Sequence, residues 1–80
     1  MEYINEILSV LYDEGIQVEY EGNDLDLREY IVESIQFISF IVDLENRFSI
    51  EIPDEVLRYE LISSLQALSC FIGRLKEDNS

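Results

Sequence analysis

The chain has 80 residues with a hydrophobic share of 48%, and its 18 acidic against five basic residues give a formal net charge of -13. This length predicts a single domain over residues 1–80, and the charge disfavours nucleic acid and anionic membranes as partners while favouring proteins with basic surfaces. The absence of histidine excludes His-dependent catalysis and the commonest zinc ligand, so we expect neither an enzyme nor a metal site.

The first predicted element is an amphipathic helix over Glu2–Glu14, ended by Gly15. Its apolar residues recur at the spacing of one helix face: Ile4, Ile7, Leu8 and Leu11. The following stretch, 15–33, has no sustained period and contains the turn signal Gly22-Asn23-Asp24. We expect a long first loop with one helical turn, and connections of this length in small domains are often functional.

The most apolar segment follows Ser34 and predicts the central helix, which runs to Phe48. Its apolar side chains cover much of the helix circumference: Ile35, Phe37, Ile38, Phe40, Ile41, Val42 and Leu44. A serine oxygen at a helix start accepts an unpaired backbone N–H and stabilises the helix by about 1 kcal/mol. We therefore predict that Ser34 is the exposed N-cap of this helix, at the positive end of its dipole.

The residues after the central helix predict an extended segment and two further helices. The alternation over Ser49–Pro53 favours an extended chain, and Pro53-Asp54-Glu55 is typical of the start of a short helix that runs to about Tyr59. Ser63 or Ser64 should cap the last helix. The apolar side chains of that helix are Leu65, Ala67, Leu68, Phe71, Ile72 and Leu75. Three main helices, one short helix and a long first loop predict an all-α four-helix bundle.

Cys70 is the single cysteine, so no internal disulfide can form. It falls within the apolar pattern of the last helix and no basic residue adjoins it, so we interpret it as a small core residue rather than a reactive thiol. The chain begins MEYINEIL, without a basic region or a cleavable apolar run, and no apolar run could span a bilayer. We expect a cytoplasmic, monomeric protein with no membrane insertion.

The segment over Glu33–Glu55, ESIQFISFIVDLENRFSIEIPDE, combines several features at fixed spacing. An acid, Ser34 and an aliphatic residue open a hydrophobic helix, the helix closes on Phe48, and the loop Ile50–Glu55 has the sequence IEIPDE. The acid-Ser-aliphatic triplet occurs by chance in many proteins, but its distance from the proline loop is specific. The segment resembles the core of the acyl carrier protein family, and the order and lengths of the predicted elements extend the resemblance to the whole chain.

The resemblance implies an all-α, four-helix bundle of acyl-carrier type, with three main helices, a short third helix and a long first loop. It implies a non-enzymatic carrier that holds an acyl or aminoacyl intermediate as a thioester on a 4'-phosphopantetheine arm. The arm would come from coenzyme A and be attached to Ser34 by a phosphopantetheinyl transferase. The cargo stays open between fatty acyl, polyketide, peptidyl or aminoacyl, and D-alanyl groups.

The resemblance also implies that loading and downstream biosynthetic enzymes with basic docking surfaces recognise the outward side of the central helix near the serine. The docking residues predicted there are Glu33, Ile35, Gln36, Val42, Asp43 and Glu45. Gln36, Ser39 and Asn46 stand where acids are frequent in the family, which favours a specialised biosynthetic pathway over bulk fatty acid synthesis. Phe37 is either part of the core or an apolar docking patch.

The alternative from another class is an acidic helical adaptor, which would bind a basic protein partner without a prosthetic group. Both interpretations predict a partner with a basic surface. Covalent uptake of one phosphopantetheinyl group from coenzyme A distinguishes the carrier from the adaptor.

Overall fold

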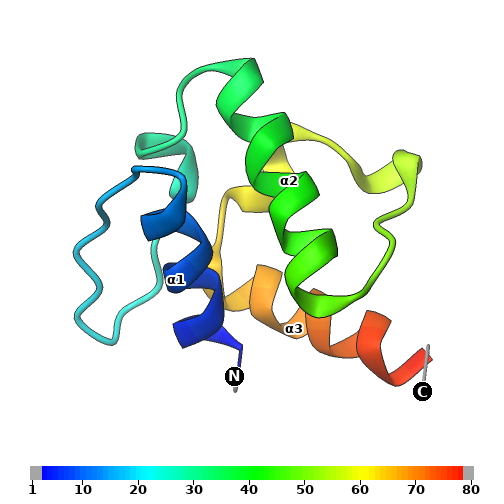
Figure 1. Ribbon diagram of the computed structural model, residues 1–80. Helices are drawn as coiled ribbons and strands as arrows, with labels where there is room; N and C mark the ends of the chain where they lie inside the picture. Colours follow the sequence, from blue (N-terminus) through cyan, green and yellow to red (C-terminus); the bar gives the residue numbers. More distant parts are fainter. Residues whose placement is uncertain (1–2, 79–80) are drawn as a thin grey trace.

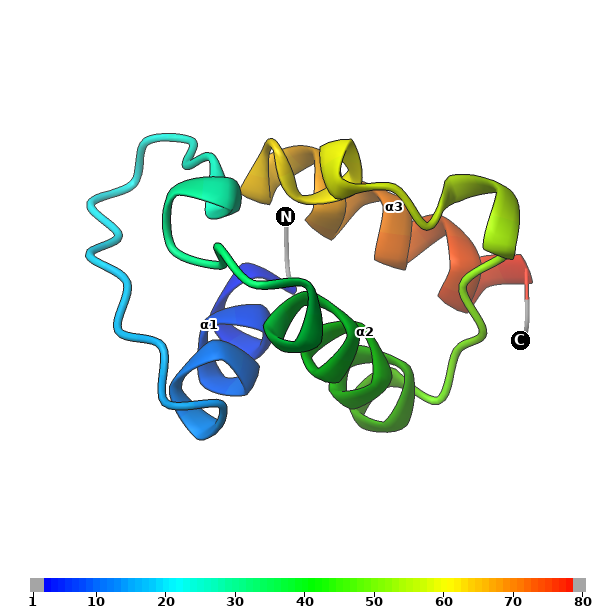
Figure 2. The ribbon, with the colours of Figure 1, turned by 90° about the horizontal axis from the view of Figure 1, so that it is seen from above.

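Three α-helices and three short 3₁₀ turns make up the computed structural model, which describes residues 3–78 and contains no β-strand in that range. The helices are α1 (Ile4–Asp13), α2 (Ser34–Phe48) and α3 (Leu65–Asp78); the turns are η1 (Leu27–Glu29), η2 (Asp54–Val56) and η3 (Tyr59–Ile62). α1 packs against both α2 and α3 (Figure 1), and the first loop lies beside α1 at one edge (Figure 2). The predicted all-α class is confirmed.

α1 ends at Asp13, and Gly15 terminates it as the sequence predicts. Gly15 has φ +79°, a left-handed conformation that favours glycine. The N–H of Ile16 donates to the carbonyl of Leu11 at 2.9 Å, and the N–H of Gly15 donates to the carbonyl of Tyr12 at 2.9 Å. These two bonds form a Schellman motif, which satisfies the last carbonyls of the helix and turns the chain into the first loop.

α2 runs from Ser34 to Phe48, so it ends where the sequence predicts and begins one residue earlier than predicted. Its buried side chains are Phe40, Ile41, Leu44 and Phe48. The helix stops where Ser49 adopts a left-handed backbone (φ 56°, ψ 47°), and the ammonium group of Lys76 donates a hydrogen bond to the carbonyl of Phe48 at 3.1 Å. A cation at this end satisfies an unpaired carbonyl and complements the negative end of the helix dipole.

The short helix expected between Pro53 and Tyr59 does not form as one helix, so the predicted four-helix count is not confirmed. Two 3₁₀ turns stand in its place, separated at Leu57, whose backbone (φ -78°, ψ 71°) has the angles of an inverse γ-turn. The N–H of Arg58 donates to the carbonyl of Val56 at 2.8 Å across this turn. The half-buried Leu57 packs against the core at this turn.

The first loop caps α3 through Asp24. One carboxylate oxygen of Asp24 accepts the Gln66 N–H at 2.9 Å, and the other accepts the Ser64 hydroxyl at 2.5 Å. The oxygen of Ser64 in turn accepts the Ala67 N–H at 3.0 Å, so Ser64, rather than Ser63, is the capping serine. The hydrogen bond from the Ser64 hydroxyl lowers the pKa of Asp24 below its ordinary 3.8, and the bond from the Gln66 N–H adds to this effect.

One hydrophobic core joins the helices to the loops. The loops contribute buried side chains of their own: Ile16, Leu27, Ile31, Ile50 and Ile52. In α3 the buried positions recur at three- and four-residue spacing, and Ser69 takes one of them at 1% exposure. Cys70 follows Ser69 and is exposed, so its prediction as a core residue is wrong. Within residues 3–78, none of the helices has the length and hydropathy needed to cross a membrane.

Candidate functional site

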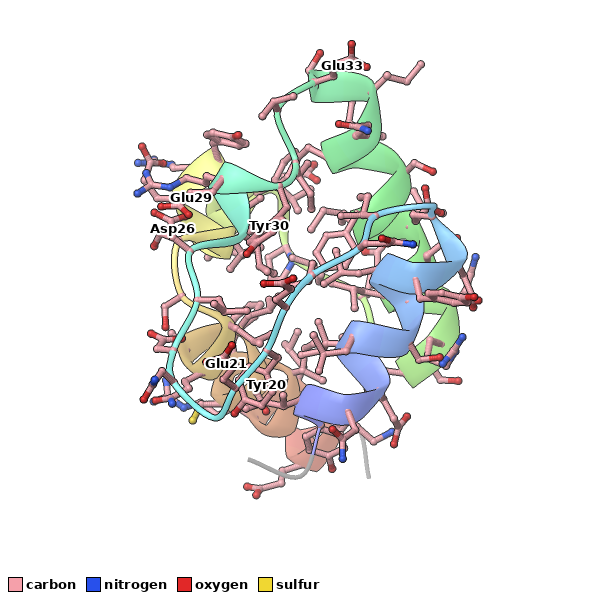
Figure 3. The ribbon with its side chains drawn as sticks, turned by 90° about the vertical axis from the view of Figure 1, so that its left-hand side faces the viewer. Tyr20, Glu21, Asp26, Glu29, Tyr30 and Glu33 are labelled. Atoms are coloured by element: carbon pink, nitrogen blue, oxygen red, sulfur yellow. The ribbon has the colours of Figure 1, made fainter. Side chains whose placement is uncertain are left out.

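Ser34 is the first residue of α2, which begins at one end of the molecule (Figure 1), and Ser34 is exposed. Glu33 precedes it as the N-cap residue with an extended backbone (φ -110°, ψ 142°), and the Glu33 carbonyl accepts the Phe37 N–H at 3.0 Å. Figure 3 shows Glu33 at the tip of this end. The prediction that Ser34 is the N-cap is therefore wrong by one residue, because Glu33 makes the turn into the helix.

The start of α2 has backbone N–H groups that no capping side chain covers. The Glu33 side chain makes no capping hydrogen bond, and the first N–H bonded to a helix carbonyl is that of Phe37. The Ser34 hydroxyl is not used as a cap and faces solvent beside these groups. A phosphate on that hydroxyl would lie at the positive end of a 15-residue helix, where an anion is stabilised by about 0.3–1 kcal/mol.

An apolar groove begins beside Ser34. It has a volume of about 330 Å³ and lies between α2 and the γ-turn that joins η2 to η3. The residues that line it are Ser34, Phe37, Ile38, Ile41, Val42, Glu45 and Leu57. A group attached to the Ser34 hydroxyl therefore starts at the edge of a concave, largely apolar surface.

Phe37 belongs to the packing around this groove. Its half-buried ring meets the ring of Tyr59 edge to face, with centroids 5.9 Å apart and an interplanar angle of 79°. The Tyr59 hydroxyl donates to the backbone carbonyls of Arg28, at 3.1 Å, and Ile31. Of the two interpretations left open for Phe37, the structure supports the packing role, and the ring contributes one wall of the groove.

A stripe of exposed apolar side chains runs along α2 from the serine end. Its members are Val32, Ile35, Ile38 and Val42. Of the predicted docking residues, Glu33, Ile35 and Val42 are exposed as expected. Ile38 is missing from that prediction although it is 61% exposed. The spacing of 35, 38 and 42 places all three on one face, away from the buried Phe40 and Leu44, and this spacing was the signal available in the sequence.

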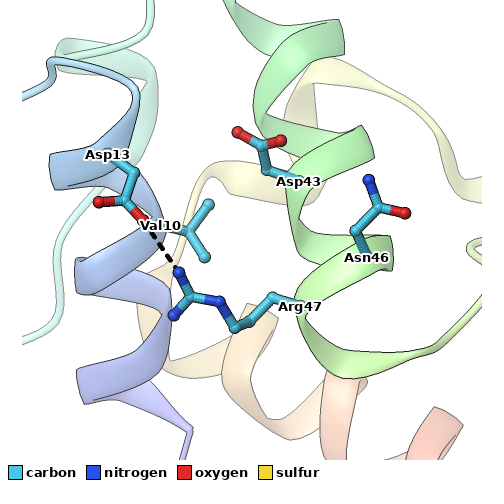
Figure 4. A pocket seen from close by; sticks show the side chains of 5 residues that line it. All are labelled: Val10, Asp13, Asp43, Asn46 and Arg47. Carbon is cyan, nitrogen blue, oxygen red and sulfur yellow. Dashed lines mark hydrogen bonds and ion pairs between the residues drawn. The ribbon is translucent and has the colours of Figure 1, made fainter.

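Gln36 and Asp43, two further predicted docking residues, are half-buried. Gln36 is half-buried, and its amide oxygen is buried with no hydrogen-bond partner in the described chain. Asp43 is half-buried where α1 packs on α2 and lines a cleft of about 440 Å³ there. The same cleft is lined by Asn46 and by the ion pair between Arg47 and Asp13, 2.9 Å long (Figure 4). Both side chains are less exposed than expected, and their role in docking stays a prediction.

Glu45, another predicted docking residue, also has a structural role. Its carboxylate accepts the backbone N–H of Ile52 at 2.8 Å, which ties the extended segment after α2 back to the helix. The side chain is half-buried and also lines the far end of the groove. In the described part of the chain, no group of three or more His, Cys, Asp or Glu side chains could hold a metal ion.

Comparison with known proteins identifies the family. The model of a phosphopantetheine attachment site matches residues 3–72, which include α1, α2 and the first part of α3. No curated protein and no solved structure matches the chain. Domains of this family carry 4'-phosphopantetheine, are typically non-catalytic, and are modified by phosphopantetheinyl transferases. The resemblance of the sequence is thus confirmed, and the chain belongs to the family of phosphopantetheine-binding carrier domains.

Proposed function

We propose that the 4'-phosphopantetheine arm of this carrier protein is attached to Ser34 and holds an acyl or aminoacyl intermediate as a thioester. The observation that carries the proposal is the place of the Ser34 hydroxyl, which is exposed at the uncapped start of α2 and beside the apolar groove. Ser34 is also the only serine in the sequence with an acid before it and an aliphatic residue after it.

The residues around Ser34 fit such an arm. Its phosphodiester would lie against the uncapped N–H groups of the first turn, and the rest of the arm and an apolar cargo could lie along the walls formed by Phe37, Ile38 and Leu57. The terminal thiol of the arm supplies the chemistry, because a thioester is an activated acyl group. The chain itself holds the arm and presents it, and the reactions belong to the partner enzymes.

The exposed apolar stripe supports a docking face for these enzymes. Ile35 is 74% exposed and Ile38 is 61% exposed, so a partner that covers them gains apolar burial that folding leaves unused. Glu33 borders the stripe and suits a basic rim on the partner. We propose that the transferase and the loading enzymes bind here, with apolar contact at the centre and charge at the edge.

The finer part of the proposal is a specialised biosynthetic pathway in the cytoplasm, with residues 1–80 acting as one monomeric carrier domain. Ser39 and Asn46 are exposed and uncharged on α2, where carriers of bulk fatty acid synthesis are often acidic. The apolar stripe beside them favours partners that bind through packing as well as charge.

Mass spectrometry tests the attachment site. Incubation with coenzyme A, Mg²⁺ and a broad-specificity transferase should add one phosphopantetheinyl group to the wild-type chain and none to Ser34→Ala. Ser39→Ala is the matched control, because Ser39 is an exposed serine of the same helix and should leave labelling unchanged. Labelling of Ser34→Ala would move the site to another residue, and an unlabelled wild-type chain would favour the adaptor.

A further inference from the structure

Tyr59 joins the chain on both sides of Ser34. Its hydroxyl donates to the carbonyls of Arg28, at 3.1 Å, and Ile31, sharing one proton between two acceptors. Its ring packs edge to face on Phe37 at a centroid distance of 5.9 Å. One side chain from η3 therefore contacts residues three positions before and three positions after the serine.

The Tyr59 hydrogen bonds are the last ones before the serine-bearing turn. Ile31 is completely buried, and its N–H donates to the carbonyl of Leu27 at 2.9 Å. Val32 and Glu33 follow with exposed side chains, and in the described chain the next bonded backbone group is the Glu33 carbonyl, which accepts the Phe37 N–H. The path of residues 32–34 is thus fixed at one end by Tyr59 and at the other by the first turn of α2.

The same side chain sets the position of Ser34 relative to the groove. Leu57, two residues before Tyr59, lines the groove opposite α2, and Phe37, beneath the Tyr59 ring, lines it on the α2 side. A shift of Tyr59 would move both walls and the turn that carries the hydroxyl. Tyr59 lies outside the apolar stripe on which we propose partners dock but is 40% exposed, so kcat and KM must be measured separately to distinguish an effect on the serine from an effect on partner binding.

We propose that Tyr59 is a positioning residue for the modification of Ser34: through its two hydrogen bonds it holds the hydroxyl in the orientation that the transferase requires. The inference rests on the proposed function, since it needs Ser34 to be the attachment site. Misplacing a reacting group by about 1 Å can cost up to roughly 100-fold in rate. Loss of the Tyr59 hydrogen bonds before the serine is therefore enough to slow transfer of the phosphopantetheinyl group.

Tyr59→Phe tests the inference, because it removes the hydroxyl and keeps the ring on Phe37. Tyr30→Phe is the matched control: Tyr30 is a half-buried tyrosine at the end of η1, close to Ser34 in the sequence, whose hydroxyl makes no hydrogen bond in the described chain. With coenzyme A and a broad-specificity transferase, we expect Tyr59→Phe to lower kcat for modification about tenfold with KM within about twofold of wild type. The ¹⁵N heteronuclear NOE of residues 32–34 should fall in Tyr59→Phe alone.

The outcomes separate this inference from the proposed function. A labelled wild-type chain with wild-type kcat and NOE values in Tyr59→Phe overturns the positioning role and leaves the attachment site standing. A rise in KM at constant kcat also overturns it, because Tyr59 would then act in docking. A wild-type chain that takes up no group overturns both proposals, and the NOE values then show only whether Tyr59 orders the segment.

Discussion

Ile38 is a large apolar side chain that the fold leaves in solvent. It is 61% exposed, whereas Ile41, three residues later on the same helix, is 4% exposed. Burying an isoleucine side chain is worth about 1.5–3 kcal/mol. Burial of Ile41 stabilises the fold. Ile38 would gain a similar free energy only when a partner covers the stripe, as we propose.

Ile38→Ala should therefore weaken docking without harming the fold. We expect KM for the transferase to rise about tenfold, equivalent to about 1.4 kcal/mol of lost contact energy. Stability to urea should stay within about 0.5 kcal/mol of wild type, as for other surface changes. Ile41→Ala is the control, and its buried side chain should cost about 2–5 kcal/mol of stability. Loss of stability in Ile38→Ala at an unchanged KM would show that the side chain serves the fold instead.

The residues around the site were predictable to different degrees. The exposure of Ser34 followed from its place at the start of an apolar helix, because a residue there has no preceding turn to cover it. The partial burial of Asp43 was not predictable, because the sequence does not show which side of α2 the helix α1 covers. Cys70 was misplaced because it and Ser69 are neighbours in an apolar pattern, and only the packed helix shows which one enters the core.

At the scale of elements, the cap of α3 comes from a residue far away in the sequence. Asp24 lies in the first loop and accepts the Gln66 N–H and the Ser64 hydroxyl, while the Leu25 carbonyl accepts the Leu65 N–H at 2.8 Å. A loop of this length is entropically costly to order. The cap therefore serves two purposes, since it satisfies the start of α3 and closes the first loop.

Asp24→Ala should destabilise the protein by about 1 kcal/mol at neutral pH, the usual cost of losing a helix cap. The folded pKa of Asp24 is below the ordinary 3.8, so its contribution is present above 3.8 and is lost as pH falls through the folded pKa. Urea unfolding at pH 7 and in acid should thus show a gap between wild type and variant that closes in acid. Glu21→Ala, an exposed acid of the same loop, should show no such gap.

Most of the helix positions were predictable from the pattern of apolar residues. α2 ends at Phe48 as the sequence predicts, because the apolar period stops there, and it begins one residue earlier than predicted, with Glu33 instead of Ser34 as the N-cap. The short helix after Pro53 was not predictable in this way. Its first turn forms, but the packing of Leu57 against the core favours a γ-turn there over a second helical turn, and the sequence alone carries no sign of that contact.

On the scale of the whole molecule, the dominant property is its net charge of -13. Within residues 3–78, Arg28 is paired with Asp26, Arg47 with Asp13, and Lys76 with the Phe48 carbonyl. Acids such as Glu21, Asp26 and Glu29 are spread along the first loop (Figure 3). Folding brings these like charges closer together, and their repulsion opposes the compact state.

Added salt should raise the melting temperature near neutral pH. The Debye length falls from about 30 Å to about 3 Å between roughly 0.01 and 1 M NaCl, which screens the repulsion between exposed carboxylates. Each kcal/mol of repulsion that is relieved should raise Tm by about 4–8 °C for a domain of this size. Differential scanning calorimetry over this range checks the effect, and a melting temperature independent of salt would mean that the acids do not strain the fold.

The position of Ser34 at one end of the molecule has a consequence for tethering. The start of α1 and the end of α3 lie at the opposite end from the start of α2 (Figure 1). A carrier held on a bead or fused to an enzyme through either of those helix ends would point its serine away from the anchor. An arm attached to Ser34, as we propose, would then move in the space beyond the start of α2 without contacting the support. Immobilisation and modification are therefore geometrically compatible in this fold.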